Sequence, residues 1–125
     1  MQFDEFGMEN EKTMLLLPGT GCTWQVNFAN VIERLQQKYH LICVNYDGFD
    51  GKKENHFPDM ITVTEKIEKY IKEYHNGKVD AAYGSSLGGS FVGLLIQRKV
   101  IHVNHGCLVK NMRKRCLKRL KNVCK

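Results

Sequence analysis

Short apolar runs alternate along this chain with longer segments in which apolar residues recur every three or four positions. The apolar runs have the length of buried strands: residues 2–6, 13–17, 40–46, 79–83 and 100–104. The longer segments have the length and pattern of helices: residues 24–35, 60–74 and 87–97. Strands that alternate with helices in this way predict an α/β protein of three layers, with a mostly parallel sheet between helices.

The predicted strands run into loops that are rich in small and turn-forming residues. Pro18-Gly19-Thr20-Gly21 follows the strand at 13–17, and a Gly- and Asp-rich loop at 47–51 follows the strand at 40–46. In a parallel sheet with right-handed crossovers, the loops that follow the strands lie at one edge. We therefore expect any functional site at this edge.

The segment Gly84-Ser85-Ser86-Leu87-Gly88 fits a Gly-x-Ser-x-Gly turn. It lies between a predicted strand and a predicted helix, which is the context that a nucleophile elbow requires. Ser86 is therefore the candidate nucleophile, and Gly84 and Gly88 provide the space for so sharp a turn. An ordinary Gly- and Ser-rich turn is the alternative interpretation of the motif alone.

Three segments together make the chain resemble the α/β-hydrolase family: LLLPGTG, VNYDGFDG and YGSSLGGS. The resemblance covers about residues 1 to 106 and implies a truncated α/β-hydrolase fold, the N-terminal half of the family's domain. It implies hydrolysis of an ester, thioester or amide in a small acyl substrate, without a cofactor. It also implies an oxyanion hole formed by the N–H groups of Leu87 and of Thr20 or Gly21.

The resemblance does not extend to a complete catalytic triad. The family uses an acid and then a histidine after the nucleophile, but no Asp or Glu follows Asp80 in this sequence. His105 is a candidate base, expected at the functional edge of the strand at 100–104, although a histidine without a catalytic role is the preferred interpretation. The remaining candidates, His40, His56 and His75, have no metal-ligand spacing and are expected to face solvent. No metal site is predicted.

Charge divides the chain into two predicted regions. Residues 110–125 contain eight Lys or Arg and no acid, whereas residues 1–109 contain eleven bases and thirteen acids. We predict a partial hydrolase domain at 1–109 and a basic, helix-compatible tail at 110–125. The tail could cap the open sheet, bind an anionic membrane or nucleic acid, or be an unselected appendage. The last is favoured, and no motif indicates specific nucleic-acid binding.

Five cysteines without a CxxC pair indicate a reduced, cytoplasmic compartment. No run is long and apolar enough for a transmembrane segment. The unpaired sheet edge of a partial domain predicts self-association.

Two other classes of function are also considered. One is a non-catalytic, hydrolase-like fragment or binding module. The other is a nucleotide-binding βαβ unit, suggested by Gly19, Gly21 and Asp47. Trp24 occupies the position of that motif's third glycine, which argues against nucleotide binding.

Overall fold

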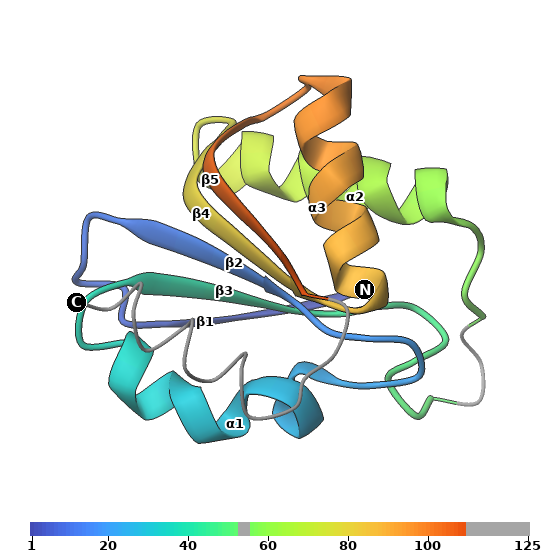
Figure 1. The fold of residues 1–125 in the computed structure, drawn as a ribbon, viewed down its shortest axis with the longest axis horizontal. Helices are drawn as coiled ribbons and strands as arrows, with labels where there is room; N and C mark the ends of the chain where they lie inside the picture. The colour runs from blue at the N-terminus through green and yellow to red at the C-terminus, as the bar shows by residue number, and fades with distance from the viewer. Residues whose placement is uncertain (53–55, 110–125) are drawn as a thin grey trace.

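The computed structural model describes residues 1–52 and 56–109. Five strands form one sheet in the order β1-β3-β2-β4-β5. The strands are β1 (Gln2–Phe6), β2 (Thr13–Leu17), β3 (His40–Asn45), β4 (Lys78–Ser85) and β5 (His102–Val109). β1 pairs with β3 in the antiparallel direction, and the remaining neighbours are parallel (Figure 1). The predicted mostly parallel sheet is confirmed, whereas the predicted tail at 110–125 lies outside the described residues.

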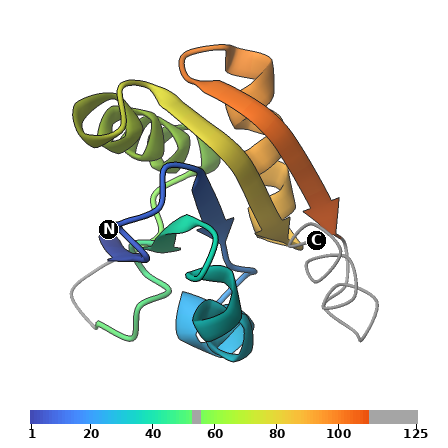
Figure 2. The ribbon, with the colours of Figure 1, turned by 90° about the vertical axis from the view of Figure 1, so that its left-hand side faces the viewer.

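Helices cover both faces of the sheet, as the three-layer prediction requires. α1 (Trp24–Leu35) lies on one face, and α2 (Met60–Tyr74) and α3 (Leu87–Arg98) lie on the other (Figures 1 and 2). The side chains of Thr23 and Asp59 cap α1 and α2 by accepting hydrogen bonds from backbone N–H groups in the first turn. These caps explain where both helices begin.

The central strands are buried on both faces because their side chains point alternately to the two helical layers. Leu15 and Leu17 pack into the core beneath α2 and α3, whereas Met14 and Leu16 pack against α1. All four side chains are at most 1% exposed. The continuous apolar run of β2 therefore reflects a strand between two layers.

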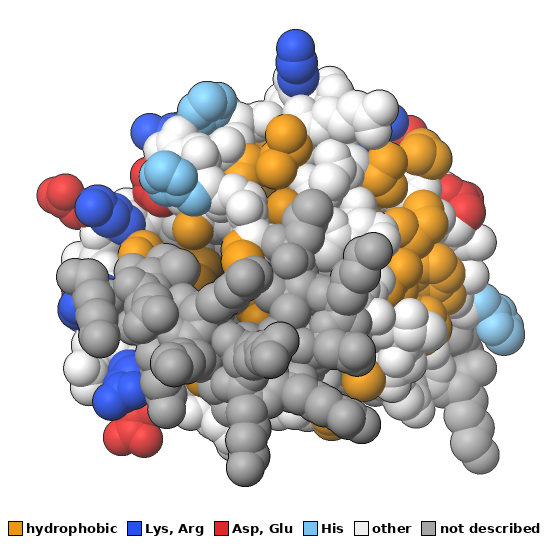
Figure 3. Space-filling view, in the orientation of Figure 1, with side chains coloured by type: hydrophobic (Ala, Val, Ile, Leu, Met, Phe, Trp, Pro, Cys, Tyr) orange, Lys and Arg blue, Asp and Glu red, His pale blue; other side chains and the backbone are white. Residues whose placement is uncertain are grey.

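Apolar side chains that reach the surface lie among charged and polar groups on the face in Figure 3.

The last strand differs from the prediction. The apolar run suggested a strand at 100–104, but β5 begins at His102 and extends to Val109. Lys99 ends α3 in a left-handed conformation (φ 55°), and His102 then pairs with Lys78. His102, Asn104 and His105 are exposed. In the described part of the chain β5 is an edge strand, where polar residues are tolerated, so apolar content underestimates its length.

Candidate active site

A strained turn joins β4 to α3 at the edge where the parallel strands end. Ser86 lies between Ser85, the last residue of β4, and Leu87, the first residue of α3. Its backbone has φ 54° and ψ −112°, a combination that glycine adopts readily and other residues rarely do. Ser85 is 3% exposed, whereas Ser86 is exposed to solvent. The turn therefore presents the Ser86 side chain at the surface.

The glycines on either side of Ser86 permit close backbone packing. A β-carbon on Gly84 would lie 2.1 Å from the carbonyl carbon and oxygen of Gly88, at the start of α3. A β-carbon on Gly88 would lie 2.0 Å from the carbonyl oxygen of Leu17, at the end of β2. Both distances are far below van der Waals contact. The motif's two glycines are thus required by the packing of α3 against β4 and β2.

The loop after β2 lies beside this turn. A β-carbon on Gly19 would be 3.6 Å from the β-carbon of Ser86 and 3.3 Å from the carbonyl oxygen of Ser85. The Cys22 N–H donates to the Gly19 carbonyl oxygen (3.1 Å), and Gly21 has φ 66°, so residues 19–22 form a tight turn. Thr20 and Gly21 are exposed. This arrangement brings the loop 18–22 to the side of Ser86, although the two are more than sixty residues apart in sequence.

Two side chains that the sequence analysis did not identify hold this loop. The Asn27 Oδ1 atom of α1 accepts a hydrogen bond from the Gly19 N–H (2.8 Å). The buried Tyr46 hydroxyl donates to the Pro18 carbonyl oxygen (2.8 Å). Burial raises the pKa of Tyr46, so the phenol stays protonated and able to donate. A polar residue on the apolar face of α1 and a tyrosine directly after β3 are weak signals that would not identify these contacts.

The N–H groups proposed for an oxyanion hole are available. Among the described residues, no group accepts a hydrogen bond from the N–H of Thr20, Gly21 or Leu87. Leu87 is the first residue of α3. At this end of a helix the N–H groups lack partners within the helix, and the helix dipole has its positive end. The turn at Ser86 therefore combines an exposed hydroxyl with unpaired donors nearby.

His105 lies far from this turn. It pairs with Ala81 in the middle of β5, not at the end of the strand as predicted. Ala81 precedes Ser86 by five residues, which is about 16 Å along an extended strand. His105 instead lines a hollow of about 530 Å³ with Asp80 and Cys107. The prediction that His105 reaches the functional edge is therefore wrong, because β5 continues four residues beyond it.

Ser86 has no triad partner in the described part of the chain. No hydrogen bond there joins its hydroxyl to a histidine. Asp80, the last acid of the sequence, lies near the start of β4 and accepts hydrogen bonds from the Thr13 N–H (2.8 Å) and the Asn104 side chain (3.2 Å). It cannot orient a base beside Ser86, since it lies at the opposite end of the strand.

The nucleotide-binding alternative lacks the free helix terminus that a phosphate needs. The Trp24 N–H at the start of α1 donates to the Asn45 side chain (2.7 Å), and the Val26 N–H donates to Thr23 (3.3 Å). The Trp24 indole N–H also donates to Asp4 (2.7 Å). Protein groups therefore occupy the place where a dinucleotide's phosphates would bind.

Two histidines that were expected to face solvent are in fact shielded. The side chains of His40 and His75 are 17% and 8% exposed, and both contact Glu5. His75 follows the end of α2 and His40 begins β3, and both side chains lie against Glu5 of β1. His56 is exposed, as predicted. Of the helices in residues 1–52 and 56–109, none has the length and apolar character needed to cross a membrane.

The fold and the turn define a three-layer α/β protein with a serine at a strand-to-helix elbow. No model of a protein family matches the sequence, and no curated protein matches it. Solved structures do match. A protein assigned to the α/β-hydrolase family from Desulfitobacterium hafniense is 27% identical (TM-score 0.76), with 82% of this chain and 41% of that chain covered.

Two further structures have the same fold at lower identity. The serine hydrolase CCSP0084 from Cycloclasticus zankles is 19% identical (TM-score 0.74), with 85% of this chain and 40% of that chain covered. A structure from a study of carboxylesterases of Nitrososphaera gargenis is 12% identical (TM-score 0.71), with 97% and 46% covered. The resemblance to the α/β-hydrolase family is thus confirmed: the chain has the α/β-hydrolase fold and spans about two fifths of the length of these proteins.

Proposed function

We propose that this chain is the nucleophile-bearing portion of a serine hydrolase, in which Ser86 attacks an ester, thioester or amide carbonyl. The observation that carries the proposal is the backbone of Ser86, which is held at φ 54° and ψ −112° while its side chain is exposed. Such strain persists only where the surrounding structure imposes it, and it is concentrated at functional sites. Here the close packing of α3 against β4 and β2, which Gly84 and Gly88 permit, surrounds the turn.

The neighbouring backbone suits the charge that develops during acyl transfer. Attack by the Ser86 oxygen on a carbonyl carbon forms a tetrahedral intermediate and moves negative charge onto the carbonyl oxygen. The N–H of Leu87, with that of Thr20 or Gly21, would donate hydrogen bonds to this oxygen. Removing one such donor typically raises the barrier by about 3 kcal/mol. The N-terminal end of α3 would stabilise the same charge.

The proton of the Ser86 hydroxyl must pass to a base that the described residues do not provide. We therefore also propose that the histidine and acid of the triad come from sequence outside this chain, which would make the chain an incomplete N-terminal portion. The matched proteins are more than twice as long, and their names include a serine hydrolase and carboxylesterases. A small acyl substrate and the absence of a cofactor follow from the same proposal.

Labelling with a fluorophosphonate tests the nucleophile. The probe reacts with a serine oxygen, and mass spectrometry of the digested protein identifies the modified residue. We expect slow labelling that is selective for Ser86 and absent from Ser86→Ala. Ser90→Ala is the matched control, because Ser90 is also exposed and lies in α3, only four residues after Ser86. Equal labelling of Ser90 and Ser86, or none at Ser86 under forcing conditions, would contradict the proposal.

Self-association through the sheet edge stays a prediction. Within residues 1–52 and 56–109, β5 has a paired strand on the β4 side alone. Its other side offers backbone groups that a second copy could pair with. Sedimentation velocity over a range of protein concentrations would detect such a dimer.

A further inference from the structure

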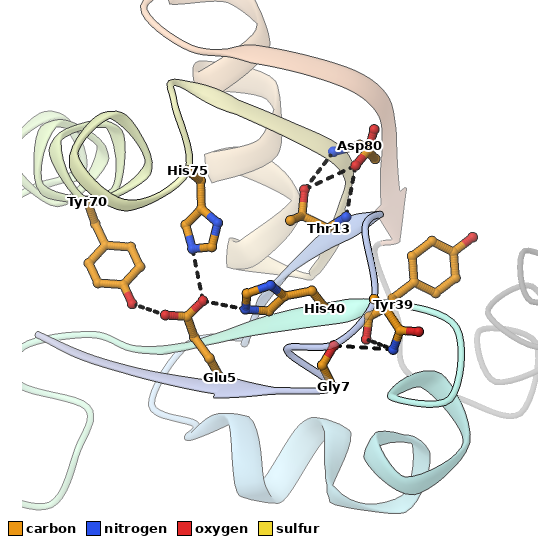
Figure 4. Close-up of polar contacts among 9 residues, drawn as sticks. Glu5, Gly7, Thr13, Tyr39, His40, Tyr70, His75 and Asp80 are labelled. Carbon is orange, nitrogen blue, oxygen red and sulfur yellow. Dashed lines mark hydrogen bonds and ion pairs between the residues drawn. The ribbon is translucent and has the colours of Figure 1, made fainter.

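Three side chains with metal-binding groups converge at the end of the sheet where the parallel strands begin, opposite the end that carries Ser86. Glu5 lies near the end of β1, His40 is the first residue of β3, and His75 directly follows α2 (Figure 4). The parallel strands begin at this edge and end at the elbow. The cluster is therefore separate from the proposed hydrolase site and does not depend on it.

The reactive atoms of the cluster lie close together. Glu5 Oε1 is 2.7 Å from His40 Nε2 and 2.9 Å from His75 Nε2. The three ligand atoms all lie within 4.8 Å of one another. The second carboxylate oxygen, Oε2, accepts a hydrogen bond from the Tyr70 hydroxyl (2.6 Å). Tyr70 thus fixes the carboxylate in the way that outer-shell partners fix metal ligands.

His75 has a bonding capacity that the protein does not satisfy. Its side chain is 8% exposed, and its Nε2 atom is buried without a hydrogen-bond partner. Glu5 Oε1 is near enough, but its direction from the ring is unsuitable for a hydrogen bond, unlike its contact with His40. A buried ring nitrogen without a partner is costly. A ligand bound by all three residues would satisfy it.

We propose that Glu5, His40 and His75 bind a divalent transition-metal ion of the Zn²⁺ type. Two imidazoles and one carboxylate are a known three-ligand set for Zn²⁺, in which water takes the fourth position. Zinc–ligand bonds of about 2.0 to 2.2 Å in a tetrahedral arrangement separate the ligand atoms by about 3.3 Å. Glu5 Oε1 is 2.7 and 2.9 Å from the two histidine nitrogens, and the three ligand atoms lie within 4.8 Å of one another, so rotations of these side chains would bring them to that spacing.

The bound ion would join three elements of the fold. β1 is the antiparallel edge strand, and a metal bridge would attach it to the start of β3 and the end of α2. Binding to the folded state alone raises its stability. At a free Zn²⁺ concentration about a hundredfold above Kd, we expect the melting temperature to rise by roughly 10 °C.

Isothermal titration calorimetry of the full chain with Zn²⁺ in a reducing buffer tests the site. We expect one ion per chain and at least tenfold weaker binding in each of Glu5→Gln, His40→Asn and His75→Asn. His105→Asn is the matched control, because His105 is exposed and lies on β5, and it should bind like the original chain. No saturable binding, or binding by the three cluster variants that is as tight as binding by the original chain, would overturn the proposal.

X-ray absorption spectroscopy of the zinc-loaded original chain gives a test that does not depend on the folding of variants. The chain has five cysteines, which also bind Zn²⁺. We expect a first coordination sphere of nitrogen and oxygen with two imidazole signatures. A sulfur-containing sphere would place the ion on the cysteines and overturn the proposal.

Discussion

The α-carbon of Gly88 lies so close to the carbonyl oxygen of Leu17 that an added β-carbon would be 2.0 Å from that oxygen. The contact joins the start of α3 to the end of β2, so it sets the distance between the elbow and the loop 18–22. Both atoms belong to the backbone of regular elements. The clash could therefore be relieved only by shifting the helix or the strand.

Gly88→Ala should accordingly destabilise the fold by about 1 to 3 kcal/mol, because overpacking of rigid elements is costly. Gly84→Ala should behave in the same way. Gly93→Ala in α3 is the matched control: its β-carbon would meet nothing within 4 Å, and alanine favours a helix over glycine by up to about 1 kcal/mol. Urea denaturation followed by circular dichroism measures all three. Destabilisation of similar size in Gly93→Ala would contradict the role assigned to Gly88.

Ser86→Gly should be more stable than Ser86→Ala, because glycine adopts φ 54° and ψ −112° without strain. The strain of a non-glycine residue in such a conformation costs about 1 to 3 kcal/mol. After the entropy that glycine loses on folding, we expect a net advantage of about 1 kcal/mol. At Ser90, within α3, the order should reverse, since alanine is the better helix former. If Ser86→Ala were at least as stable as Ser86→Gly, the elbow would not be strained.

Tyr46→Phe should weaken the support of the loop 18–22. The substitution removes the hydrogen bond to the Pro18 carbonyl oxygen and leaves that oxygen unpaired in a buried place. We expect a loss of about 1 to 2 kcal/mol in the free energy of unfolding and slower fluorophosphonate labelling of Ser86. Tyr74→Phe is the control, as Tyr74 is 66% exposed. If labelling were unchanged in a destabilised Tyr46→Phe, the tyrosine would support the core rather than the loop.

The elements of this fold could be predicted from sequence where burial is symmetric. β2 and β3 are covered on both faces, so their residues form continuous apolar runs such as residues 13–17. β5 was misplaced because an edge strand carries polar residues such as His105, at which the predicted strand had already ended. The elbow was predicted because Gly84, Ser86 and Gly88 lie within five consecutive residues, so the motif is visible locally in the sequence.

Contacts between distant residues could not be predicted in this way. Glu5, His40 and His75 are separated by at least thirty-five residues from one another, and no spacing rule connects them. They meet because β1 turns back antiparallel to β3 and α2 ends above both. Similarly, the contact of Tyr46 with Pro18 depends on the parallel register of β2 and β3.

Asp47 should make stability depend on pH in the acidic range. Burial tends to raise the pKa of this carboxyl, but hydrogen bonds from Lys66 (2.6 Å) and the Met1 ammonium group lower it overall. A carboxyl with a lowered pKa in the folded state stabilises the fold above its unfolded value of about 3.9, and this contribution disappears as the pH falls through the folded value. Asp47 is 13% exposed.

Asp47→Asn should therefore be less stable than the original chain at pH 7, by about 1 kcal/mol because Lys66 is half-exposed and partly screened. The difference should shrink as the pH falls below about 4. Glu9→Gln, at an exposed position, is the control and should show no such trend. Urea denaturation measures the free energy of unfolding of each variant. A range from about pH 2 to about pH 7 spans the carboxyl titration. A difference that persists at the acidic end would point to lost packing instead of lost charge.

The chain alone should hydrolyse p-nitrophenyl acetate slowly. Donors for the oxyanion can act without a base, but in well-studied serine enzymes they retain only about a thousand- to ten-thousandfold acceleration over water when the triad is removed. The described residues place no histidine in contact with Ser86, so we expect a rate far below the roughly 1 to 1,000 per second of ordinary enzymes. Ser86→Ala should reduce this small rate further, and Ser90→Ala should not. Turnover at an ordinary enzymatic rate that is lost in Ser86→Ala would keep Ser86 as nucleophile but contradict the proposal that its base lies outside this chain. Substitution of each histidine in turn would then identify the base.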